Sequence, residues 1–326
     1  MADQSPKGWV VEQGIGEERA LLYRKGQVVA AHMRWPGALE PGAVLDGVLV
    51  AKPKGSTRGR ARFASGEEAL VDRLPRDASE GASMRFRITR AAVGETNRVK
   101  LAQARPTDRD RRPAPTLAES LPGAKVVRCF THDDWEEVRD LAVDGIVTFT
   151  GGSLHFAPTP AMVVVDVDGH LPPRELALAA VEPLARAIAV FGLGGMIGVD
   201  FPTLETKVDR KAVDEMLESA LADFDHERTA MNGFGFVQLV ARFERPSMLH
   251  LLQHDPIGAA ARLLLRRAEA LGGGGGVIEL NAHPAVLARL NEGWLAELQR
   301  RTGTELSMKS DPALAREAAN AQLVAR

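Results

Sequence analysis

The chain has 326 residues, of which 45% are hydrophobic and 26% charged, with a formal net charge of −2. This composition is long enough for two or three domains with cores of their own, and the single cysteine, Cys129, excludes an internal disulfide and a cysteine-rich zinc site. The apolar runs are too short to cross a bilayer, and the polar start of the chain does not resemble a signal peptide. We therefore expect a soluble, cytoplasmic protein with no membrane partner.

Charge is distributed unevenly along the chain. Residues 1–112 carry 21 Lys and Arg against 14 Asp and Glu, whereas residues 113–326 carry 20 against 29. A basic first third and an acidic remainder suggest that one part holds a polyanion and another part holds cations. A chance distribution is the alternative interpretation.

The first third of the chain is predicted to be β-rich. Short β-prone runs within residues 1–37 form a first group, and Arg24-Lys25-Gly26 is predicted to be a hairpin turn. Five further runs fit a small OB-type barrel over residues 38–104, and they lie at residues 48–51, 58–63, 68–72, 84–89 and 99–102.

Arginines alternate with small or apolar residues in two of these five runs, so they are expected on the outer face of the barrel. Such a basic face is typical of nucleic-acid binding. The candidate binding residues are Lys52, Lys54, Arg58, Arg60, Arg62, Arg85 and Arg87.

Residues 105–124 are rich in proline and charge and are predicted to be a linker. Strands and helices alternate afterwards, which predicts a core domain over residues 125–250 and a small α/β domain over residues 251–326. The expected strands lie at 146–150, 154–156, 162–167, 196–201, 234–240, 277–280 and 305–308, and the expected helices at 135–141, 173–190, 208–224, 257–271, 284–300 and the end of the chain. The predicted fold class is thus a mixture of α+β and α/β.

Three aspartates end two apolar strands of the predicted core. Asp166 and Asp168 flank Val167 and so share one face, and Asp200 ends the strand that begins near Met196. Carboxylates at neighbouring strand ends often line a cleft, and a few oxygen ligands suit magnesium. A magnesium ion there could activate water and stabilise a phosphate during in-line displacement. Aspartates at strand ends also cap helices and form turns, and this alternative stays open.

Several other catalytic classes find no support. The glycines of Gly192-Leu-Gly194-Gly195 follow a helix and open a strand, which is the reverse of a phosphate-binding loop. The chain has no Gly-x-Ser-x-Gly, P-loop or His-Glu-x-x-His motif, so the sequence does not indicate a serine hydrolase, a kinase or a zinc protease.

Several segments resemble the ribonuclease E/G family, in matching order and spacing over about residues 150–310. They are Gly151-Gly-Ser-Leu154, Thr159-Pro-Ala-Met-Val-Val-Val-Asp-Val-Asp-Gly169, Leu193-Gly-Gly-Met-Ile-Gly-Val-Asp-Phe201, Phe234-Gly-Phe-Val-Gln-Leu239, Arg245-Pro-Ser247 and Leu290 through Gly303. The resemblance implies an RNase H-like segment carrying an inserted OB-type RNA-binding domain, followed by a DNase I-like catalytic core. It also implies Mg2+-dependent endonucleolytic cleavage of single-stranded RNA.

The resemblance assigns roles to individual residues. Asp166 and Asp200 match the family's metal-binding aspartates, and Asp168 stands where the family has Asn. The implied catalytic residues are thus Asp166, Asp168 and Asp200, with Asp166 and Asp200 as metal ligands. Arg242 is the one basic residue kept where the family has Thr-Arg-Lys-Arg, and it joins the barrel residues as an RNA-binding candidate.

The chain also departs from the family's pattern. It lacks the length for the family's separate sensor of the RNA 5′ end and the Cys-x-x-Cys that links protomers through zinc, so no zinc-linked dimer is expected and the oligomeric state is left open. Thr203 stands where a third acidic residue is common. Two alternatives to a nuclease therefore remain, a non-catalytic RNA-binding protein on a degenerate scaffold and an assembly factor with no RNA role.

Overall fold

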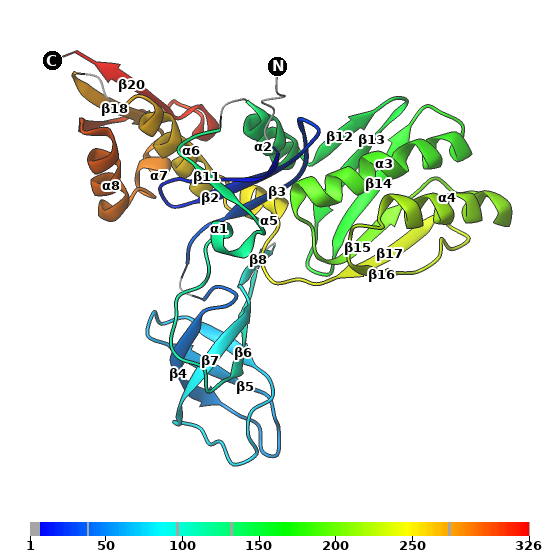
Figure 1. The fold of residues 1–326 in the computed structure, drawn as a ribbon, viewed down its shortest axis with the longest axis horizontal. Coiled ribbons are helices and arrows are strands. Elements are labelled where there is room, and N and C mark those ends of the chain that lie inside the picture. The colour runs from blue at the N-terminus through cyan, green and yellow to red at the C-terminus, as the bar shows by residue number, and fades with distance from the viewer. Residues whose placement is uncertain (1–6, 38, 96–97, 131–132, 273–274, 326) are drawn as a thin grey trace.

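The computed structural model describes residues 7–37, 39–95, 98–130, 133–272 and 275–325. Three lobes extend from a central N-terminal sheet: a barrel below it, a large sheet with its helices to the right, and a small C-terminal domain to the left (Figure 1). None of the helices in the described part of the chain is long and apolar enough to cross a membrane.

The central sheet has the strand order β11-β1-β2-β3. Its strands are β1 (Gly8–Gln13), β2 (Glu18–Arg24), β3 (Gln27–Arg34) and β11 (Lys125–Val127). The predicted hairpin turn is confirmed, because Lys25 and Gly26 both have positive φ (50° and 74°), which matches the twist of a two-residue β-hairpin. Strand β11 pairs with β1 in parallel. The barrel is therefore an insertion between β3 and β11.

The inserted domain is a closed five-stranded barrel with the order β10-β6-β5-β4-β7. Its strands are β4 (Val44–Ala51), β5 (Gly59–Phe63), β6 (Glu68–Val71), β7 (Ser83–Arg90) and β10 (Ala102–Pro106). Strand β10 closes the barrel by pairing antiparallel with β7 and parallel with β6, which is consistent with an OB-type barrel. Apolar side chains fill its interior, among them Leu49, Phe63, Phe86 and Ile88.

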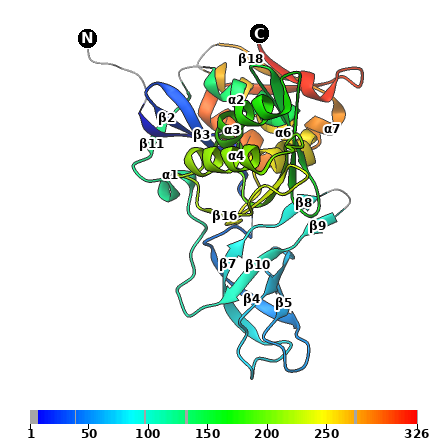
Figure 2. The same cartoon turned by 90° about the vertical axis from the view of Figure 1, so that its right-hand side faces the viewer.

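The fifth predicted barrel strand is placed differently from the expectation. Residues 99–102 span the end of β9 (Arg98–Lys100) and the start of β10, and β9 pairs with β8 (Val93–Glu95) outside the barrel. The reason is burial: Val99 is 58% exposed, whereas Ala102 and Ala104 are sealed in the barrel core. Figure 2 shows the β8–β9 hairpin reaching from the barrel towards the rest of the molecule.

Specific contacts join the barrel to the other lobes. The Lys100 ammonium donates to the Pro160 carbonyl at 2.8 Å, and the Ala91 amide donates to the Glu244 carbonyl at 2.8 Å. After the barrel, the short helix α1 (Leu117–Ser120) begins with a capping box, and the Leu117 amide donates to Glu18 of β2 at 2.7 Å. The barrel is thus attached through both its hairpin and its return segment.

The large lobe is a six-stranded sheet with the order β12-β13-β14-β15-β17-β16. Its strands are β12 (Ile146–Phe149), β13 (Gly152–Pro158), β14 (Val163–Gly169), β15 (Gly195–Asp200), β16 (His226–Arg228) and β17 (Phe236–Ala241), and its helices are α2 (Asp134–Asp144), α3 (Pro173–Phe191) and α4 (Lys207–Ala220). Helix α3 connects the parallel strands β14 and β15, and it packs with α4 on one face of the sheet (Figure 1).

One hydrophobic core fixes this lobe against the central sheet. Val165 and Val199 of the large sheet, Leu184 of α3, Val213 of α4 and Leu21 of β2 all belong to the same buried cluster. Within the described residues, no helix packs on the middle strands of the opposite face of the six-stranded sheet, where Asp166 and Met196 are exposed. The mixed α+β class is confirmed, and the DNase I-like assignment of this lobe stays a prediction.

The C-terminal domain packs helices on a three-stranded sheet of order β19-β18-β20. Its elements, with the preceding helix α5, are α5 (Met248–His254), α6 (Pro256–Ala270), β18 (Val277–Ala282), α7 (Pro284–Leu287), α8 (Glu292–Thr302), β19 (Glu305–Ser310), a 3-10 turn (Arg316–Ala318) and β20 (Asn320–Val324). Two expectations were wrong here. The helix at 284–300 is divided, because Asn291 caps a new helix by accepting from the Trp294 amide at 2.9 Å, and the final helix is the strand β20, which pairs with β18.

Candidate active site

Two of the predicted site residues are neighbours at the end of the large sheet. Asp166, in the middle of β14, is the register partner of Asp200, the last residue of the parallel strand β15. Register partners point to the same face of a sheet, on strands about 5 Å apart. Val165, Val167 and Val199 occupy the helix-covered side, so both exposed carboxylates lie on the open face.

The third aspartate lies one row further along. Asp168 is the register partner of Ser153 on β13, and its Oδ1 accepts a hydrogen bond from the Gly169 amide at 2.8 Å. One oxygen of this carboxylate therefore already accepts a hydrogen bond at the end of β14. Among the residues that the structure describes, no three His, Cys, Asp or Glu side chains form a group that could hold a metal ion.

The donor chemistry of this edge nevertheless fits magnesium. Magnesium keeps several of its waters and is commonly held by one or two carboxylates, and Asp166 with Asp200 supplies two adjacent ones. The arginine at the start of α3, Arg174, is already paired with Asp209 of α4 at 2.8 Å. No ion pair of either strand-end aspartate is found within the described residues. Two carboxylates on register partners of neighbouring strands repel each other when both are ionised.

A histidine that the sequence did not single out lies beside these aspartates. His155 of β13 is the register partner of Asp166, so His155, Asp166 and Asp200 form one row across three strands. Its exposed ring has Nε2 2.9 Å from the Ser153 hydroxyl. Alternation along residues 152–158 could have placed Ser153 and His155 on one face, but only the strand register shows that they face the aspartates.

Apart from this histidine, the open face carries acidic, uncharged polar and apolar side chains. Its strand residues are Ile146, Thr148, Ser153, His155, Ala157, Val164, Asp166, Asp168, Met196, Gly198, Asp200, Glu227, Phe236, Gln238 and Val240. In this set, which lies wholly within the described residues, His155 is the one side chain that can carry positive charge. A polyanion can approach this face only with added cations or with cationic groups supplied from another part of the molecule.

Arg242 does not lie with the aspartates. Asp200 pairs with Phe236 at one end of β15, and Gly195 pairs with Ala241 at the other end. Arg242 follows Ala241, so about 20 Å of strand separates it from the aspartates at the usual rise per residue. It is 78% exposed and forms an ion pair with Glu244.

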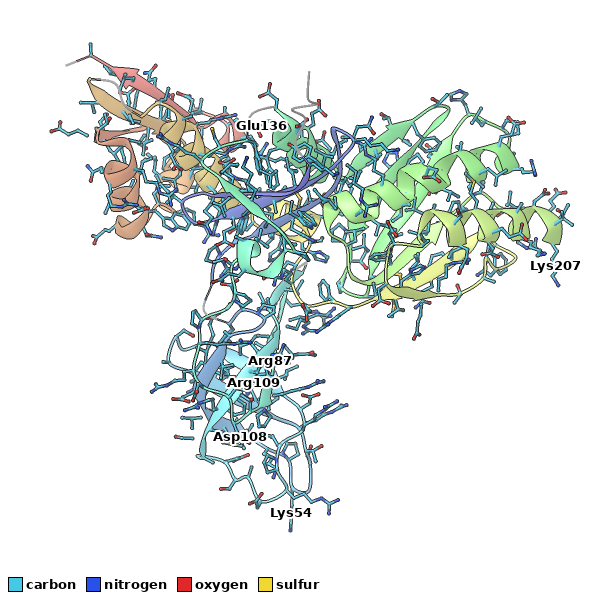
Figure 3. The ribbon with its side chains drawn as sticks, in the orientation of Figure 1. Lys54, Arg87, Asp108, Arg109, Glu136 and Lys207 are labelled. Atoms are coloured by element: carbon cyan, nitrogen blue, oxygen red, sulfur yellow. The ribbon has the colours of Figure 1, made fainter. Side chains whose placement is uncertain are left out.

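The basic residues of the barrel form a band over three adjacent strands. Arg60 and Arg62 of β5 both pair with Glu68, at 2.9 and 2.7 Å. On the other side of β4, Arg85 of β7 contacts Asp46 at 3.2 Å, and Arg87 lies further along the same strand (Figure 3). The band is therefore basic in excess, although two acidic side chains neutralise part of it.

The remaining lysines and Arg58 have different surroundings. Lys52 donates to the carbonyls of Pro75, Arg76 and Ala78 at 2.7–3.0 Å, which ties down the loop after β6 and occupies its three ammonium protons. Lys54 and Arg58 are exposed on the loop between β4 and β5, and Figure 3 shows Lys54 at the end of the barrel far from the other lobes. Lys52 thus has a structural role, whereas Lys54 and Arg58 remain free to meet a ligand.

The fold and this edge together define a class of protein: an α+β protein in which an OB-type barrel is inserted ahead of a sheet that ends in paired carboxylates. No family model matches the chain. The chain is 31% identical over 121 residues to Ribonuclease G of Escherichia coli (strain K12) and of Salmonella typhimurium (strain SL1344), and 30% identical over 115 residues to Ribonuclease G of Haemophilus influenzae.

These alignments are partial. Each covers 32% of this chain, and the aligned part is 24% or 23% of the relative, so the match spans about a quarter of the length of these ribonucleases. The matching third of the chain relates it to the ribonuclease E/G family.

Proposed function

We propose that this protein is a magnesium-dependent endoribonuclease that cleaves single-stranded RNA. The observation that carries the proposal is the register pairing of Asp166 with Asp200 on the open face of the large sheet. The relation to Ribonuclease G supports RNA as the substrate. The barrel, with its band of arginines, supplies the surface on which a single strand would be held.

The chain's own groups have separable tasks in this proposal. Asp166 and Asp200 would hold the magnesium ion, and Asp168 lies one row away, where it can accept hydrogen bonds from the ion's waters. When bound, the ion supplies an activated water and a counter-charge for the phosphate. If the Ser153 hydroxyl donates to His155 Nε2, the Nδ1 atom carries the proton and can donate to a phosphate oxygen. Arg60, Arg62 and Arg85 would hold phosphates further along the strand.

The test is cleavage of end-labelled single-stranded RNA in the presence of magnesium. Asp166→Asn and Asp200→Asn should each lower the cleavage rate on the order of 10³-fold, about 4 kcal/mol in the activation barrier. Glu227→Gln is the matched control, because Glu227 is an exposed carboxylate on the same face but pairs with Val240 towards the other end of the sheet. Its rate should stay within about threefold of the wild type, a difference of less than 1 kcal/mol.

The proposal fails if RNA stays intact under conditions in which the wild-type protein binds it. A chelator should stop cleavage without abolishing binding to the barrel. Cleavage that continues at an unchanged rate in Asp166→Asn would also exclude this site.

A second candidate function is RNA binding without cleavage. The observation that favours it is the scarcity of cationic side chains on the open face, where His155 is the one strand residue within the described range that can become positive. In this case RNA binds with the usual dependence on salt, and neither Asp166→Asn nor magnesium changes the fate of the RNA.

A further inference from the structure

One aromatic side chain in this protein is left in solvent. The chain has 11 Phe, four Trp and one Tyr, all of them within the described residues, and among these Phe234 alone is exposed, at 81%. The barrel's own phenylalanines, Phe63 and Phe86, pack edge to face in its core with ring centres 5.8 Å apart. The barrel surface therefore presents no aromatic ring on which a base could stack.

The backbone under Phe234 is held rigidly. The Asn232 side chain accepts hydrogen bonds from the amides of Phe234 and Phe236, at 2.9 and 3.1 Å, and the Thr203 hydroxyl donates to the Phe234 carbonyl at 3.4 Å. Gly235 has φ +91°, and a Cβ on it would lie 2.3 Å from the Phe201 carbonyl oxygen. No side chain fits there, so Gly235 brings the turn directly against the end of β15.

This turn adjoins the carboxylate edge. Phe236 is the register partner of Asp200, and the Phe201 amide donates to the Gly235 carbonyl at 3.2 Å. Phe234 thus lies opposite the residues that immediately follow Asp200. Because the backbone that carries the exposed ring is already fixed, little backbone entropy is lost when the ring binds a flat partner. Stacking of a base on an aromatic ring contributes about 1–3 kcal/mol without regard to sequence.

We propose that Phe234 is a positioning residue on which an unpaired nucleobase next to the scissile phosphate stacks. This inference rests on the proposed function, because it assumes that single-stranded RNA passes the Asp166–Asp200 edge. Phe234 would then favour single-stranded over double-stranded RNA. A base within a duplex is already stacked on both sides and cannot turn its face to the ring.

The test measures RNA affinity with single abasic sites placed in turn along a short single-stranded RNA. All proteins carry Asp166→Asn, which removes cleavage from the binding measurement. Phe234→Leu should weaken binding of the intact RNA roughly 5- to 150-fold, the range that corresponds to loss of one stacked base, whereas Phe234→Trp should retain it. Val208→Ala is the matched control, because Val208 is a 77% exposed apolar residue on α4, and this variant should bind as the parent does.

The decisive result is coupling between protein and RNA. One abasic position should cost the parent as much affinity as Phe234→Leu does, and should cost the Phe234→Leu variant nothing further. The stacking role is overturned if the losses of affinity from the abasic site and from Phe234→Leu add at every position. It is also overturned if Phe234→Leu binds the intact RNA as tightly as the parent does.

The outcomes also separate this inference from the proposed function. Coupling in the binding cycle without cleavage by the wild type leaves the stacking role and removes the nuclease. Cleavage by the wild type without coupling supports the nuclease and excludes the stacking role. Absence of RNA binding excludes both the nuclease and the stacking role.

Discussion

Charged side chains gather in two regions of this molecule, and the two groups are built in opposite ways. In the central sheet, Arg19 is fully buried between Glu12 and Glu17, with its guanidinium 5.9 Å from the centre of the Trp135 ring. At the end of the large sheet, Asp166 and Asp200 are exposed side by side with no cationic partner among the described residues.

The difference follows from the cost of desolvating charge. A buried charge is tolerated only when it is paired and hydrogen-bonded, and Glu12 also accepts from the Phe130 amide at 3.0 Å. Burial is the largest influence on Glu12 and raises the pKa of its carboxyl, while Arg19 and Arg266 oppose that rise. The buried carboxylates are therefore compensated by partners inside the protein, whereas the exposed pair has no such partner among the described residues.

The largest expected effect is on the buried group. Arg19→Met leaves Glu12 and Glu17 without their main partner, and should lower the free energy of unfolding by about 3–4 kcal/mol. Arg24→Met removes an exposed pair with Asp223, whose side chains are 62% and 82% exposed, and should cost less than about 1 kcal/mol. Urea unfolding of the two variants measures both values, and similar losses would contradict the distinction drawn here.

The next effect concerns a partly buried titratable group of the same sheet, His32. Burial lowers the pKa of His32 to about 4, and the Arg245 guanidinium adds to the shift. An unfolded histidine titrates near 6.5, so the unfolded state takes up the proton first as the pH falls. Stability contributed by neutral His32 is complete above about pH 6.5 and should be lost by about 2–3 kcal/mol on the way to pH 4.

His32→Phe keeps an aromatic ring to stack on Trp9, whose ring centre is 5.1 Å from that of His32. Urea unfolding at pH 7.5, 5.5 and 4.5 should show a shallower loss of stability for this variant than for the wild type. Parallel curves would mean that His32 is not protonated selectively in the unfolded state.

A smaller effect is expected at the barrel. The double variant Arg60→Gln, Arg62→Gln should weaken binding of single-stranded RNA about three- to tenfold and lower the slope of log affinity against log salt by about 1–2. The loss is limited because Glu68 already neutralises part of this charge. Arg300→Gln on α8 is the control, because Arg300 is 70% exposed and also paired with a glutamate, Glu297. Fluorescence anisotropy titrations of labelled RNA at several salt concentrations measure both quantities. Equal effects of the barrel variant and the Arg300→Gln control would exclude the barrel face as the RNA-binding surface.

The smallest effect has the opposite sign from the first. Asp200→Asn removes the repulsion between Asp166 and Asp200, and should raise the free energy of unfolding by a few tenths of a kcal/mol without magnesium. Magnesium should stabilise the wild type in proportion to its binding and leave the variant unchanged. Thermal unfolding with and without magnesium measures both, and a marked loss of stability in Asp200→Asn would show that this carboxylate serves the fold.

Local patterns predicted much of the secondary structure. The three N-terminal strands, the hairpin at Lys25-Gly26 and the strands that carry the aspartates follow from apolar alternation and turn residues. Where local preference was weak, tertiary burial decided the outcome. Residues 320–324 form a strand because they complete a sheet beside β18, and residues 98–100 leave the barrel because Val99 stays outside its core.

The candidate site was also predicted only in part from the sequence. The sequence singled out the aspartates as candidates, because they follow apolar residues within segments that resemble a known family. It could not show that β14 and β15 are parallel neighbours with Asp166 level with Asp200, or that His155 completes the row. The sequence also singled out the arginines of the barrel. It could not show that Lys52 donates all three of its ammonium protons to backbone carbonyls, or that Arg242 lies near the start of β15, away from the aspartates.

By itself, the sequence determined most of the strands and helices and which residues carry charge, because these depend mainly on neighbours a few positions apart. Only the tertiary structure decided which charges become buried and paired, which remain exposed together, and that Phe234 stands in solvent beside the carboxylates. The physical reason is that desolvation and strand register depend on residues distant in the chain, and neither is encoded in any short stretch of it.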